Sequence, residues 1–147
     1  MSLDPLANLA KIGLLDAVPF SLDLQSRMMA SAQSRLVDAM RQGNSAETRF
    51  DCAYTAIRAV ADAALLSKGY RTSTSRPGHH QTTLQCLVHT LGVDPQNVVV
   101  LDALRKQRNL SDYEGDAVTQ SLLDECIKQA QAVLALALET LTPPRSV

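Results

Sequence analysis

The sequence of 147 residues has no tryptophan, and it contains only three tyrosines, two phenylalanines, six glycines and six prolines. An all-β protein needs frequent turns and bulky strand residues, so this scarcity argues against a β-sandwich. Few aromatic rings also argue against a protein that stacks the bases of single-stranded nucleic acid. The composition therefore favours a helical fold.

The sequence also lacks an excess of either charge. Fourteen lysines and arginines stand against fifteen acidic residues, which gives a net charge of −1. No overall field then draws the chain to nucleic acid or to an anionic membrane. The longest uncharged apolar stretch is too short to span a membrane, and the charged residues Asp4, Lys11 and Asp16 argue against a signal peptide. We expect a cytoplasmic protein that does not associate with membranes.

Cysteine and histidine are few and show no metal-binding pattern. Cys52, Cys86 and Cys126 lie far apart, which is typical of reduced thiols rather than of a disulfide framework. The adjacent His79 and His80 would point about 100° apart on a helix, and the sequence has no H-E-x-x-H motif. It also has no glycine-rich phosphate loop. We therefore predict no metal and no cofactor.

Apolar residues recur every three or four positions through most of the chain, which predicts helices. Capping residues mark several helix starts: Asp4 and Asp94 each precede a proline, and Ser45 can cap a third helix. The predicted helices cover residues 4–16, 21–42, 45–67, 79–91, a segment from Asp94 to about Arg108, and 116–140. Pro143-Pro144 ends the last helix, and residues 69–78 are predicted to form a loop.

These elements predict an all-α fold, an antiparallel up-and-down bundle of four to five main helices. Residues 1–20 form an N-terminal helical extension, and residues 21–147 form the bundle. In the helix over 45–67, the polar residues Asp51, Thr55, Arg58 and Asp62 lie opposite the apolar face. The apolar stripe of the last helix covers more than half of its circumference, so this helix is either central or docked on a second subunit. On this stripe we base the prediction of a homodimer.

The segment Leu104–Gly115 concentrates charge at the predicted junction between two helices. Arg105, Lys106 and Arg108 place three cations in four positions, and Asn109 and Asp112 are typical of turns and caps. In one interpretation the cations complement a helix C-terminus, and Asp112 caps the last helix.

In the other interpretation, Arg108, Asp112 and Tyr113 form one polar cluster that lines a groove. The arginine fork suits phosphate or carboxylate, and the 69–78 loop could bring further positive charge to the same side. The candidate ligand-binding residues are Arg105, Arg108, Asn109, Asp112, Tyr113, His79 and His80.

Three segments resemble HEPN domains, small helical modules found in many prokaryotic toxin–antitoxin and nucleotidyltransferase-partner proteins. The segments are AYTAIRAVADAALL (53–66), the stretch from G-Y-R to G-H-H (69–80), and R-N-x-x-D-Y (108–113). The resemblance covers residues 21–141. In ribonuclease members, an arginine is followed at this junction by a histidine, and two subunits bring two copies together across a dimer cleft. Here Tyr113 stands where that histidine is expected, as in the branch generally regarded as non-nucleolytic.

Three hypotheses follow. The first is a non-catalytic HEPN-like module that binds a nucleotide, RNA or a partner protein through a groove at Arg108–Tyr113. The second is a metal-independent endoribonuclease toxin that combines Arg108 with Tyr113 or with a histidine from the 79–80 pair. The third is a purely structural dimer. Because a tyrosine hydroxyl is a poor base at neutral pH, we predict no catalytic residue and favour the first hypothesis.

Overall fold

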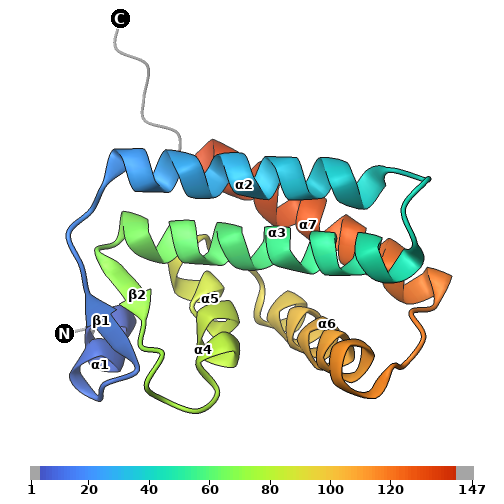
Figure 1. The fold of residues 1–147 in the computed structure, drawn as a ribbon. Helices are drawn as coiled ribbons and strands as arrows, with labels where there is room; N and C mark the ends of the chain where they lie inside the picture. Colours follow the sequence, from blue (N-terminus) through green and yellow to red (C-terminus); the bar gives the residue numbers. More distant parts are fainter. Residues whose placement is uncertain (1–3, 142–147) are drawn as a thin grey trace, which may run out of the picture.

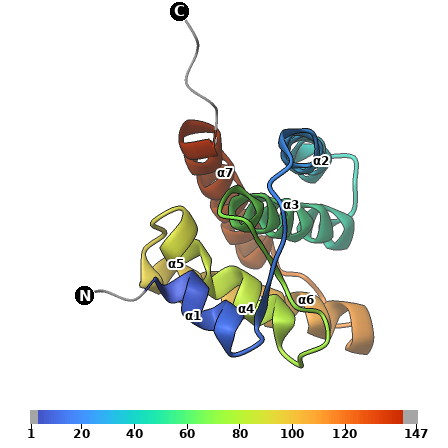
Figure 2. The same cartoon turned by 90° about the vertical axis from the view of Figure 1, so that its left-hand side faces the viewer.

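Helix α3 (Ala46–Ser67) lies at the centre of the molecule in the computed structural model, which describes residues 4–141. Figures 1 and 2 show α2 and α7 on one side of α3, and α4, α5 and α6 on the other. The other elements are α1 (Pro5–Lys11), β1 (Leu15–Ala17), α2 (Leu22–Met40), β2 (Tyr70–Thr72), α4 (His79–Gln85), α5 (Leu87–Thr90), α6 (Pro95–Glu114) and α7 (Gln120–Leu141). The predicted all-α bundle with an extra N-terminal helix is confirmed.

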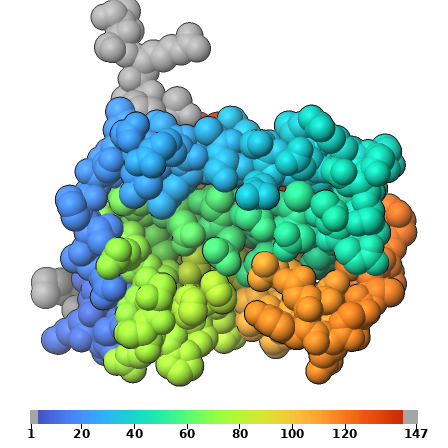
Figure 3. Space-filling view, viewed as in Figure 1, coloured from blue at the N-terminus to red at the C-terminus, as the bar shows by residue number. Residues whose placement is uncertain are grey.

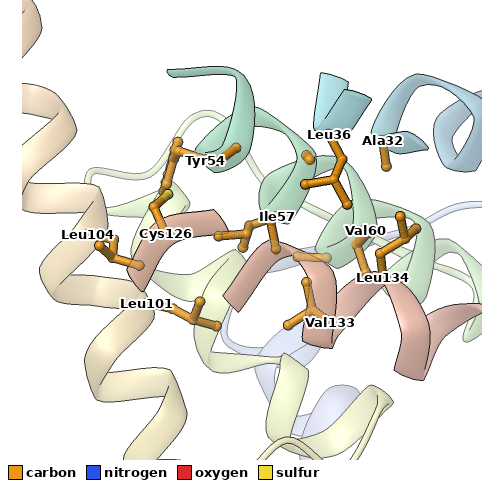
Figure 4. Close-up of a cluster of buried hydrophobic side chains, with 14 of the residues drawn as sticks. Ala32, Leu36, Tyr54, Ile57, Val60, Leu101, Leu104, Cys126, Val133 and Leu134 are labelled. Carbon is orange, nitrogen blue, oxygen red and sulfur yellow. The ribbon is translucent and has the colours of Figure 1, made fainter. Parts of the chain in front are cut away.

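The sequence of α3 suits a central helix. The Ser45 hydroxyl accepts a hydrogen bond from the Thr48 amide at 3.1 Å, so the helix begins where the cap predicts. Many of its buried residues are alanines, which favour helix and let neighbouring helices approach closely. Figure 4 shows Ile57 and Val60 clustered with Val133 of α7, and all three side chains are buried. Each such burial contributes about 1.5–3 kcal/mol, which explains how α3 organises the bundle.

Helix α7 packs against α3 and α2 along most of its apolar stripe. It runs in the same sense as α3, whereas α2 runs antiparallel to both (Figure 1). Within residues 118–141, the stripe's apolar side chains are buried or half-buried, apart from Leu138, which is 40% exposed. The surplus apolar face behind the predicted homodimer is therefore small, and the homodimer stays a prediction. Among residues 4–141, no helix is long and apolar enough to cross a membrane.

The helix predicted over residues 4–16 is shorter than expected. Asp4 caps α1 by accepting a hydrogen bond from the Leu6 amide at 3.0 Å, as predicted, but α1 ends at Lys11. Gly13 follows with a φ of 84°, a left-handed conformation that glycine adopts without strain. This turn ends the helix and lets the next residues become a strand.

Strand β1 pairs antiparallel with β2, which lies in the segment predicted to be a loop. Asp16 faces Arg71 across the ladder, and their side chains lie 3.8 Å apart. A small second core, made by Leu6, Leu15, Leu65 and Cys86, fixes this corner to the bundle. The two strands are more than fifty residues apart in sequence, so local patterns did not predict the pairing.

Three other boundaries differ from the predictions. The helix predicted over 79–91 is divided at Cys86 into α4 and α5. Helix α6 continues through Glu114 and ends at Gly115, whose φ is 71°, so residues 109–112 are helical and form no turn. Helix α7 begins at Gln120 rather than at 116, and Thr119, not Asp112, accepts a hydrogen bond from its first turn. The end predicted at Pro143-Pro144 lies outside the described residues.

Candidate functional site

Two arginines of α6, Arg105 and Arg108, are each fixed by aspartates. The Nε atom of Arg108 lies 3.1 Å from a carboxylate oxygen of Asp51 on α3 and 3.3 Å from one of Asp112. The Nε atom of Arg105 donates to Asp102 at 2.8 Å, and both of those side chains are less than one-fifth exposed. The extension of α6 makes this possible, because it places Asp112 one helical turn after Arg108.

These bonds hold the arginines without using most of their donors. A guanidinium carries five N–H groups, and the Nε hydrogen is only one of them. The Cζ atom of Arg108 also lies 5.6 Å from the ring centre of the buried Tyr54, which adds a cation–π contact. Burial acts to lower the pKa of Arg108. The hydrogen bond to Asp51 and the charges of Asp51 and Asp112 outweigh this effect and raise the pKa. Both arginines are thus fixed and able to donate to a ligand.

Tyr113 does not join this cluster. Five residues along a helix correspond to a rotation of about 140° away from Arg108, and the tyrosine side chain is 83% exposed. Asn109 lies with Tyr113 in a surface hollow on the other side of α6, lined also by Lys106, Leu110 and Glu114. The structure therefore brings Arg105, Arg108 and Asp112 to one face, and places Asn109 and Tyr113 on another.

The two histidines lie at the start of α4. Their ring centres are 4.1 Å apart, and Nδ1 of His79 lies 3.3 Å from the carbonyl oxygen of Arg76. Both side chains are half-buried and line a cavity of about 580 Å³ between the start of α2, the middle of α3, β2 and α4. The predicted site residues therefore belong to two neighbouring places, the arginines on α6 and the histidines at this cavity.

The cavity combines an apolar wall with a charged one. Leu24, Met28 and Leu66 contribute apolar surface, while Arg58 and Asp62 of α3 add opposite charges beside the histidines. A cavity of this size, mostly apolar with a few convergent polar groups, is typical of small-molecule sites. In the space-filling view of Figure 3, the surfaces of α2, α3, α4 and α6 meet on one side of the molecule.

Arg58 and Asp62 are functional candidates that the sequence did not indicate. The helical pattern placed them opposite the apolar face, which would usually face solvent, but both are half-buried. Burial raises the pKa of the Asp62 carboxyl, although the charges of Arg58 and His79 act in the opposite direction. The available signal was helical spacing, because Arg58 and Asp62 follow the buried Tyr54 on the same side of α3.

The charges of the α6 arginines contribute to the electrostatic environment of His80 at the cavity. Burial lowers the pKa of His80, and the positive charges of His79, Arg58, Arg108 and Arg105 lower it further. Burial raises the pKa of Tyr54, while the charges of Arg58, Arg105 and Arg108 act to lower it. Burial and the positive charges on α3, α4 and α6 thus all favour the neutral form of the His80 imidazole.

The three thiols are all buried and free. Burial raises the pKa of Cys86 to about 11 and that of Cys126 to about 12, so neither forms a thiolate readily near neutral pH. Within residues 4–141, no group of three or more histidine, cysteine or acidic side chains could hold a metal ion.

The sequence matches no protein-family model and none of the curated proteins searched.

Proposed function

We propose that the protein is a non-catalytic, HEPN-like binding module whose α6 arginines hold the phosphate of a nucleotide or of RNA. The observation that carries this proposal is the placement of Arg105 and Arg108 through their Nε atoms, which leaves the Nη groups for a ligand. Phosphate matches the planar guanidinium fork in shape and charge. Side chains that are already positioned lose less conformational freedom on binding.

The test measures binding of a fluorescent mononucleotide and of a fluorescein-labelled RNA hexamer by anisotropy at low salt. Arg105→Ala and Arg108→Ala should each weaken binding about tenfold or more, because a charged hydrogen bond contributes about 1.5–3 kcal/mol. Arg27→Ala is the matched control, since Arg27 is also held through Nε by an aspartate, Asp23, at 3.1 Å, but on an exposed face of α2. Binding that is absent, or weakened equally by the control, would refute the proposal.

One observation favours a second candidate, a metal-independent endoribonuclease. His80 has a lowered pKa and lies within the electrostatic influence of Arg108, so a neutral imidazole is available near a cation that could stabilise a phosphorane. A fluorogenic RNA substrate distinguishes the two functions. Cleavage that disappears in both Arg108→Ala and His80→Gln supports the enzyme, whereas binding without cleavage supports the module.

A further inference from the structure

The cavity beside α4 contains two opposite charges that form no ion pair with each other. In the described part of the chain, no hydrogen bond or ion pair involves the side chains of Arg58, Asp62 or His80, although Arg58 and Asp62 are one helical turn apart on α3. Side chains at this spacing are neighbours and commonly pair. Their separation therefore needs an explanation from their surroundings.

Helical spacing does not by itself prevent such a pair. Arg108 and Asp112 have the same order and spacing on α6, and their charged atoms lie 3.3 Å apart. Asp23 and Arg27 on α2 also pair, at 3.1 Å. Arg58 and Asp62 differ from these pairs because both line the cavity. They present a cation and a carboxylate to the same cavity.

Keeping these charges beside an apolar wall opposes folding unless something else satisfies them. A half-buried carboxylate without a hydrogen bond loses hydration, and the raised pKa of Asp62 reflects that loss. A ligand with groups of both signs would satisfy Asp62 and Arg58 together. Its uncharged part would lie against Leu24, Met28 and Leu66.

We propose that this cavity binds a small zwitterion with an apolar side chain, of the α-amino acid class. Its ammonium group donates to Asp62, its carboxylate accepts from Arg58 with His80 beside it, and its side chain packs on the apolar wall. The site is separate from the α6 arginines, so this inference does not depend on the proposed phosphate site.

The test uses the full chain and calorimetric titration with L-phenylalanine and L-leucine. Two single-charge analogues accompany L-phenylalanine: 2-phenylethylamine lacks the carboxylate, and 3-phenylpropionate lacks the ammonium group. We expect saturable binding of the amino acids and at least a tenfold loss with either analogue, because each leaves a charged partner unsatisfied. Absence of binding by both amino acids, or equal binding of the analogues, would overturn the proposal.

Variants distinguish this site from the phosphate site. Asp62→Asn should abolish binding of L-phenylalanine and leave nucleotide binding unchanged, while Arg108→Ala should do the reverse. Asp62→Asn should also raise the melting temperature of the free protein, since it removes a poorly hydrated charge, so a folding defect is distinguishable from loss of the site. Asp124→Asn, at an exposed position on α7, is the matched control and should change neither measurement. Amino acid binding that survives Asp62→Asn would place the ligand elsewhere and refute this assignment.

Discussion

The contact between Arg108 and Asp51 should stabilise the packing of α6 on α3 by a measurable free energy. The guanidinium is 26% exposed and the carboxylate 46% exposed, at a separation of 3.1 Å. Exposed ion pairs contribute about 0.2–1 kcal/mol, and partial burial places this one near the upper end of that range. The contacts of Arg108 with Asp112 and with the Tyr54 ring should contribute about 0.5–1 kcal/mol each. Arg108→Ala should therefore lower the free energy of unfolding by about 2–3 kcal/mol.

A double-mutant cycle separates the Asp51 contact from the rest. Urea unfolding of the natural protein, Arg108→Ala, Asp51→Ala and the double variant should give a coupling energy of about 1 kcal/mol. The coupling should shrink in 0.5 M salt, because both groups are partly exposed. A coupling energy of zero at low salt would show that Asp51 does not hold the guanidinium. Arg108 would then lack the contact with α3 that positions it in advance for phosphate.

Three other predictions follow from burial and charge. In the folded protein, Cys86 and Cys126 should not react with a thiol reagent at pH 8, because their pKa values are about 11 and 12. Both thiols should react fully in urea, and rapid labelling of the folded protein would contradict the prediction. The pKa of His80 in the folded protein lies below its ordinary value of 6.5, so the unfolded chain binds more protons just below that pH. The stability of the folded protein should therefore decrease as the pH falls below about 6.5. In His80→Gln, the melting temperature should depend less on pH over this range. An unchanged pH dependence would show that the half-buried His80 imidazole does not cause the decrease. Light scattering at low micromolar concentration should give the mass of a dimer, and a monomer mass would end that prediction.

Local sequence signals predicted the helices well where a cap and an apolar pattern agreed. Asp4, Ser45 and Asp94 all cap helices as predicted, with side-chain oxygens that accept hydrogen bonds from the first turn. The run Val98–Leu101 is helical in spite of its β-branched residues, because the Asp94 cap precedes it and the apolar spacing continues through Leu104. These features depend on residues within one or two turns of each other.

Features that depend on distant residues were not predicted. The pairing of β1 with β2 joins the segment before α2 to the segment after α3, and no local pattern encodes it. The end of α6 was mispredicted for a local reason: Asn109 and Asp112 are common in turns, but α6 continues through them because Asp112 pairs with Arg108 and Gly115 supplies the left-handed end. The coverage of Asp62 by elements other than α3 is also a tertiary effect, so helical periodicity could not separate it from a solvent-facing acid.

The near-zero net charge bears directly on how the two sites would bind. Asp51, Asp102 and Asp112 offset the charges of the α6 arginines, so long-range attraction for RNA is weak and affinity must come from geometry at short distance. Arg58 and Asp62 place opposite charges in a single cavity, and the proposed ligand carries both complementary charges. A protein built in this way would select ligands by the placement of charged groups, because its overall field attracts neither anions nor cations strongly.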